Sequence, residues 1–128
     1  MLPVRKLSEL TKVTMRRIRL MVVGPPSFLT PVVRRAWANA GVDLQGPVAA
    51  TDLAAAVVGA PVDGAVIDVD YDAPALLNVV ELFEALSVPA LFASASSEFQ
   101  GGFTFSSGPP AINAIVHQLL GAHQTTLQ

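Results

Sequence analysis

Residues 64–72, with the sequence GAVIDVDYD, decide the fold class of this chain. An apolar run ends there in three carboxylates at alternate positions, followed by Ala73 and Pro74. A short β-rich run with a glycine before it and an acidic, proline-marked segment after it predicts a buried strand over residues 65–68. In open α/β sheets, ligands gather just beyond the carboxyl ends of the strands. Asp68 is therefore the first candidate for a functional residue.

The composition bounds the class of protein. A chain of 128 residues is long enough for one domain with a real core. It has no cysteine, which excludes disulfides and thiolate metal sites, and its two histidines, His117 and His123, argue against histidine-based metal or nucleophile clusters. No uninterrupted apolar window has the length of a membrane span, and no signal-peptide pattern opens the chain. We expect a soluble cytoplasmic protein that does not act on membranes.

Charge is distributed unevenly along the chain. All eight basic residues lie in the first 35 positions and nine of the ten acidic residues lie after them, so no lysine follows Lys12. The basic segment is either an exposed leader on an acidic domain or an arm for nucleic acid or an acidic partner. No aromatic residues interleave with its charges, which favours the leader and no nucleic-acid partner. We expect a leader at 1–14, a domain at 15–122 and a frayed tail at 123–128.

Hydrophobic periodicity predicts alternating strands and helices. Strands are expected at residues 18–23, 42–45 (ended by the turn pair Gly46-Pro47), 65–68, 88–93 and 103–105. Helices are expected after Ser27 or Thr30 up to Gly41, at 52–58 with Thr51 as cap, from Asp72 as cap to Leu86, and from 110 onward. This alternation predicts an α/β fold, a flavodoxin-like doubly wound sheet of five parallel strands in the order 2-1-3-4-5. The helix after the fourth strand is expected to be short or missing.

With this order of elements, the chain resembles the receiver domain of two-component response regulators over residues 17–120. The resemblance rests on residues 18–23, on 46–51 after the second strand, on 63–69 around the third and on 88–94 at the fourth. It implies that Asp68 is at the phosphoacceptor position and Ser94 at the hydroxyl switch position. The aromatic switch position falls on Phe105, or on Phe103 if the register slips.

The chain departs from that family at two positions. The family's acidic pair for a divalent cation is replaced by Gly24, Pro25 and Pro26, and its lysine by Gly108. Phosphoryl transfer depends on a metal and on cationic side chains, and Mg²⁺ needs carboxylate oxygens. Two interpretations are open for the three carboxylates of Asp68, Asp70 and Asp72. They form an unorthodox cation site, or Asp68 only ends a strand, Asp70 is solvated and Asp72 caps a helix. We favour the second interpretation for Asp70 and Asp72.

We therefore expect an atypical receiver-like signalling module that acts by protein–protein interaction, with no enzyme activity, no catalytic residue, no metal ligands and no cofactor. Its expected partner is a signalling protein, either a histidine kinase or a sensor protein, and a homodimer through the last helix is also expected. Three alternatives remain: a working receiver phosphorylated on Asp68 with Mg²⁺, a pseudo-receiver of the antiterminator type, and a small-ligand sensor.

Overall fold

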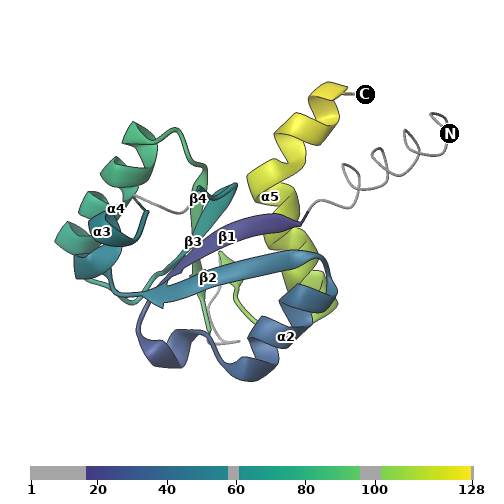
Figure 1. Ribbon diagram of the computed structural model, residues 1–128, viewed down its shortest axis with the longest axis horizontal. Coiled ribbons are helices and arrows are strands. Elements are labelled where there is room, and N and C mark those ends of the chain that lie inside the picture. The colour runs from purple at the N-terminus through teal and green to yellow at the C-terminus, as the bar shows by residue number, and fades with distance from the viewer. Residues whose placement is uncertain (1–16, 58–60, 96–101, 128) are drawn as a thin grey trace, which may run out of the picture.

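The computed structural model describes residues 17–57, 61–95 and 102–127, with side chains described as far as residue 121. Within these ranges the chain forms one five-stranded sheet with the order β2-β1-β3-β4-β5, and every neighbouring pair of strands is parallel (Figure 1). The predicted flavodoxin-like topology is confirmed. The strands are β1 (Ile18–Val23), β2 (Val42–Val48), β3 (Gly64–Asp68), β4 (Ala90–Ser94) and β5 (Phe103–Thr104).

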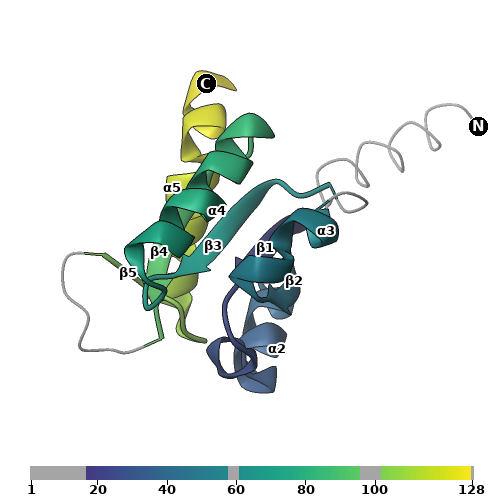
Figure 2. The same cartoon turned by 90° about the vertical axis from the view of Figure 1, so that its left-hand side faces the viewer.

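Helices cover both faces of the sheet. α2 and α5 lie on one face, and α3 and α4 lie on the other, which faces the viewer in Figure 2. Alternate residues of the central strands divide between two cores: Leu20 and Val22 point towards α2 and α5, whereas Met21 and Val23 point towards α3 and α4. The helices are α2 (Pro31–Asn39), α3 (Leu53–Val57), α4 (Ala73–Ala85) and α5 (Pro109–Leu127), with 3₁₀ turns η1 (Pro26–Phe28) and η2 (Ala50–Asp52).

Two predicted helix caps are observed. The Thr30 side chain accepts a hydrogen bond from the Val33 backbone N–H at 3.2 Å, and the Asp72 carboxylate accepts one from Ala75 N–H at 3.0 Å. Each cap satisfies one of the amide donors that the first helical turn leaves unpaired. Asp72 is thus a structural residue at the start of α4.

Some predicted boundaries are wrong. β2 continues to Val48, because Gly46 adopts a φ of +107° and lets the ladder resume, after a bulge, where Val48 pairs with Val23. Thr51 does not cap a helix, since it lies inside η2. α5 extends to Leu127, and the frayed tail expected at 123–128 stays a prediction.

The connection between β4 and β5 consists of residues 95–102, which is eight residues. A parallel crossover that includes a helix usually needs at least ten to twelve residues. The prediction that this helix is short or missing falls on residues 96–101, which lie outside the described ranges. On β4 the Phe92 side chain, on the same side of the sheet as α4, is 38% exposed.

Within the described ranges, none of the helices combines the length and the apolar character needed to cross a membrane.

Candidate functional site

The carboxyl ends of three neighbouring strands bring the predicted site residues together. Val23 of β1 pairs with Ile67 of β3, so Gly24 and Asp68 are the next residues along the two strands. Asp68 in turn pairs with Ala93 of β4, and Ser94 follows it. The positions predicted for the acidic pair, the phosphoacceptor and the hydroxyl therefore lie along one edge of the sheet.

Asp68 is a buried carboxyl, with 5% of its surface exposed. Its Oδ1 accepts a hydrogen bond from the Asp70 backbone N–H at 3.0 Å. Burial raises the pKa of Asp68 above its ordinary value of 3.8. The hydrogen bond from Asp70 N–H lowers this pKa, and the nearby charge of the Asp70 carboxylate raises it further, but burial has the largest effect. The surroundings of Asp68 thus favour the neutral acid more than water does.

Ser94 ends β4 and is also buried, with 4% of its surface exposed. It pairs with Thr104 of β5, and its carbonyl oxygen accepts a hydrogen bond from the Phe105 N–H at 2.8 Å. Its position directly after the residue that pairs with Asp68 agrees with the one that the resemblance implies for the hydroxyl. Asp68 and Ser94 thus both lie at strand ends, as the sequence predicts, and their roles in a phosphorylation site stay a prediction.

The loop after β1 differs from a metal-binding loop in its backbone as well as in its side chains. The Gly24 N–H is already used, because it donates to the Val48 carbonyl oxygen at 2.9 Å. Pro25 and Pro26 have no N–H at all. The Pro25 carbonyl accepts from Phe28 N–H at 2.9 Å, which closes the η1 turn. From Gly24 to Pro26, therefore, no backbone donor remains for an anionic group.

Phe28 fills the space beside Gly24. A Cβ added to Gly24 would lie 2.8 Å from Phe28 Cδ2 and 2.9 Å from Phe28 Cβ and Cγ, distances that real Cβ atoms do not show. Any side chain at position 24, including aspartate, requires Phe28 or the backbone to move. The carboxylate is therefore missing from this position, and its space is occupied by an aromatic ring.

The Phe28 ring belongs to a buried aromatic cluster, which consists of Phe28, Trp37 and Phe105. Phe28 stacks on Phe105 with ring centroids 4.8 Å apart and an interplanar angle of 19°, and Trp37 lies 5.4 Å from Phe105. The Trp37 Nε1–H donates to the Ser106 carbonyl at 2.9 Å. The stack links the end of β1 to the end of β5, across the edge where β3 and β4 also end.

The remaining predicted positions have structural surroundings. Phe105 follows β5 and is fully buried in the aromatic cluster, and Phe103 is partly buried against the same core. Gly108, at the position of the family's lysine, precedes α5, and its carbonyl accepts from Ile112 N–H at 3.0 Å. Of the basic residues, Arg34 donates to the Leu44 carbonyl at 2.8 Å, so it is engaged with β2.

The donor atoms present do not fit Mg²⁺, which the fold's relatives would bind at this edge. A magnesium site needs several oxygen ligands in octahedral arrangement, usually including carboxylates. Among the described residues, Asp68 is the one carboxylate that ends a strand at this edge; Asp70 is exposed and Asp72 caps α4. In the described part of the chain, no three His, Asp or Glu side chains gather as a metal ligand group.

The sequence interpretation missed the role of Phe28, which fell within the helix that was expected to begin after Ser27 or Thr30. The available signal was Gly24 followed by two prolines and, two residues later, Phe28, because the prolines turn the chain back over the strand end. At the edge itself, both Asp68 and Ser94 are buried, with 5% and 4% of their surfaces exposed.

Comparison with known proteins agrees with the fold. No family model matches the chain, and no curated protein matches it. A solved structure does: the crystal structure of the response regulator PhyR from Brucella abortus, at a TM-score of 0.62 and 15% sequence identity. The match covers 95% of this chain and 56% of the PhyR chain, so this chain spans about half the length of PhyR. At this identity the match shows the fold, which is that of a response regulator receiver.

Proposed function

We propose that the chain is an atypical receiver-like signalling module that acts by protein–protein contact and has lost the magnesium-dependent phosphorylation of Asp68. It catalyses no reaction of its own in this proposal. The receiver fold supports the class of module, and the chemistry of the carboxyl edge supports the loss. The observation that carries the proposal is the Phe28 ring, packed against Gly24 where the metal-binding carboxylates would stand.

Charge supports the same proposal. An acyl phosphate on Asp68 would bring additional negative charge to a buried carboxyl whose pKa is already raised by burial. Phosphoryl transfer sites offset such charge with metal ions and with lysine or arginine. The chain has no lysine or arginine after Arg35, and Gly108 stands at the lysine position. A phosphoryl group at Asp68 would therefore lack the lysine that the resemblance implies for offsetting its charge.

Without phosphorylation, the module that we propose would signal through contact with a partner protein. Large apolar side chains are exposed at four described positions, on α2, α4, the turn after α4, and β4: Val32, Leu77, Leu86 and Phe92. Three of them, at 58%, 47% and 38% exposure, lie on or next to α4 and β4. Of these, Leu86 and Phe92 each line an apolar hollow beside α4, and exposed apolar surface of this kind is typical of a docking site. A signalling protein, a histidine kinase or a sensor, is the partner that we propose.

A working receiver is the competing function, and one observation favours it: Asp68 and Ser94 lie at adjacent strand ends, as phosphorylation would need. Incubation with acetyl phosphate and Mg²⁺, followed by intact-mass spectrometry, separates the two functions. The chain is expected to gain no phosphoryl group, like the variant Asp68→Asn. A phosphorylated species that appears in the wild type and is absent in Asp68→Asn would overturn the proposal.

A further inference from the structure

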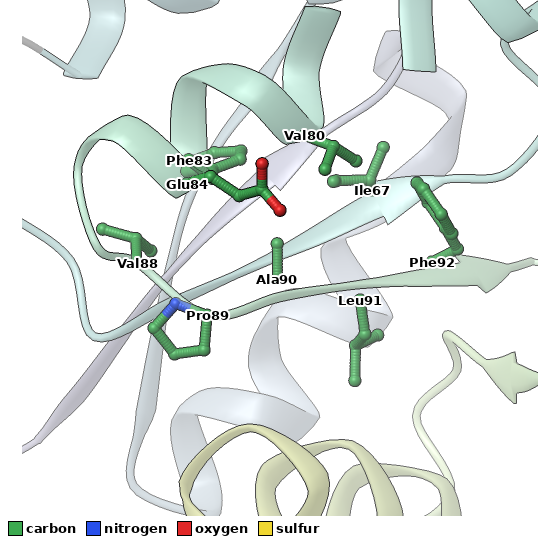
Figure 3. A pocket seen from close by; sticks show the side chains of 9 residues that line it. All are labelled: Ile67, Val80, Phe83, Glu84, Val88, Pro89, Ala90, Leu91 and Phe92. Carbon is green, nitrogen blue, oxygen red and sulfur yellow. The ribbon is translucent and has the colours of Figure 1, made fainter. Parts of the chain in front are cut away.

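Three adjoining hollows follow the edge at which the strands begin, on the face covered by α3 and α4. The first, of about 310 Å³, lies between α4 and β4 (Figure 3). The second, of about 230 Å³, lies at the C-terminal end of α4 and shares Phe83 and Val88 with the first. The third, of about 510 Å³, shares Pro61 and Val62 with the second and is lined by Arg17. Together they form one run, the N-edge groove.

The α4–β4 end of the N-edge groove is apolar with a single carboxylate. Val80 and Phe92 lie on its walls, and Glu84 extends from α4 over the strand towards Ala90 (Figure 3). No basic residue lines this end. The groove therefore suits a segment that carries apolar side chains and at least one cation.

The opposite end of the groove lies where the described chain begins. Arg17, the first described residue, lines it. Met21 of β1 pairs with Ala65 of β3, and Ala65 pairs with Ala90 of β4. Ala90 therefore lies two strands away from β1. It is level with Met21, which is three residues further along β1 than the first strand residue, Ile18. These offsets are about 10 Å across and about 10 Å along. The first 16 residues span about 24 Å as a helix, and more if extended, which is enough to reach.

The composition of residues 1–16 matches the groove. Leu7, Leu10 and Val13 recur at every third position, and basic residues stand between and beside them. Glu84 is exposed on α4 and no lysine or arginine lines this end of the groove, so its carboxylate is accessible to a basic side chain of residues 1–16. Opposite charges that meet across a contact set its register and its specificity.

We propose that residues 1–16 dock in the N-edge groove of the same molecule, with their apolar side chains against Val80 and Phe92 and a basic side chain against Glu84. The proposal goes beyond the proposed function and depends on none of its evidence about Asp68.

A spin label tests the docking in the full chain. The protein has no cysteine, so Ser8→Cys provides a single attachment site for a nitroxide. In ¹H–¹⁵N spectra the label is expected to broaden the amide signals of Val62, Val88 and Phe92, and to leave those of Asn113 and Ala36 on the opposite face sharp. Glu84→Lys is expected to restore the broadened signals. Glu81→Lys, on the same helix but outside the groove, is expected not to.

Two outcomes would overturn the proposal. One is a label that broadens no groove amide, or that broadens both faces equally. The other is found by mixing spin-labelled, unenriched protein with unlabelled ¹⁵N protein: if groove amides broaden only between copies, the occupant is the segment of a second molecule. Neither result bears on phosphorylation, which is measured separately.

Discussion

Gly24 shapes the carboxyl edge more than any other single residue, although it contributes no functional group. Its missing side chain lets the Phe28 ring pack against the end of β1. The same ring stacks on Phe105, so the core on the α2 and α5 face extends to the edge where Asp68 lies. Burial, in turn, raises the pKa of Asp68. A glycine and a phenylalanine thus convert a polar edge into part of the core.

Replacement of Gly24 by alanine is expected to destabilise the fold by about 1–3 kcal/mol, the usual cost of extra atoms in a packed core. The added Cβ would lie 2.8 Å from Phe28, and Phe28 is held by its stack on Phe105. Urea denaturation measures the loss. Gly108→Ala is the control, because its Cβ would meet no atom closer than 3.6 Å and its cost should be smaller. Equal losses in both variants would contradict the crowding at Gly24.

The pH dependence of stability should report the burial of Asp68. Since the folded-state pKa of Asp68 is raised above its ordinary 3.8, the native state holds this proton more tightly than the unfolded state. The stabilising contribution of protonated Asp68 is fully present at a pH below its ordinary pKa. This contribution is lost as the pH rises from the ordinary pKa through the raised pKa of the folded state.

Asp68→Asn keeps an acceptor for Asp70 N–H and carries no charge. The variant is expected to be more stable than the wild type at neutral pH, and the difference should shrink as the pH falls below the ordinary pKa. Denaturant titrations of both proteins at a series of pH values measure this difference in stability. The contributions of the other carboxylates are the same in both proteins and cancel in the difference. A variant less stable than the wild type at neutral pH would contradict the assignment.

α4 depends on the carboxylate run that precedes it. Asp68, Asp70 and Asp72 look alike in the sequence, but the first is buried, the second is exposed and the third caps the helix. A cap satisfies one of the amides left open in the first turn, and its negative charge lies at the positive end of the helix dipole. Three similar residues therefore have three separate environments within one loop.

Asp72→Ala is expected to cost about 0.5–2 kcal/mol, the usual range for loss of an N-cap. Asp70→Ala, two residues earlier, is expected to change stability by less than about 0.5 kcal/mol, as exposed substitutions usually do. Thermal unfolding of both variants at neutral pH makes the comparison. If Asp70→Ala proved the more costly of the two, the interpretation of this loop would be wrong.

Elements with a strong local pattern were predictable from the sequence. β1 has the predicted bounds, and Asp72 caps α4 as its position before Pro74 indicates. The end of β2 was not predictable in this way, because glycine followed by proline usually marks a turn. Here, Gly46 instead continues the strand past a bulge beside β1. Leu86, where α4 was expected to end, follows the last residue of this helix and is 47% exposed.

The whole molecule brings together residues that no local pattern connects. Asp68 and Ser94 could be placed from the sequence because each ends a strand, and the strand order makes those ends neighbours. The stack of Phe28 on Phe105 could not be predicted from the sequence. It joins the ends of the first and last strands through packing that depends on the complete fold. The sequence shows which carboxylates and which lysine are missing. The fold shows what occupies part of that space.

Self-association tests the contact surface of the molecule. The sequence predicts a homodimer through the last helix, and light scattering at high micromolar concentration is expected to give the mass of a dimer. Along α5, as far as its side chains are described, the exposed residues are Pro109, Pro110, Asn113, Ala114, His117 and Gln118, and none of them is a large apolar residue. A monomer at these concentrations would contradict the predicted dimer.

The central claim, that the receiver fold is retained without its magnesium-dependent phosphorylation site, is tested most directly by beryllofluoride, which mimics the phosphoryl group. ¹H–¹⁵N spectra are recorded with and without beryllofluoride and Mg²⁺, beside a receiver domain that has an intact acidic pair and lysine. We predict no specific shifts at Asp68, Ser94 or Phe105, whereas the control receiver shifts strongly. Saturable shifts at Asp68 and Ser94 that require Mg²⁺ and disappear in Asp68→Asn would contradict the account.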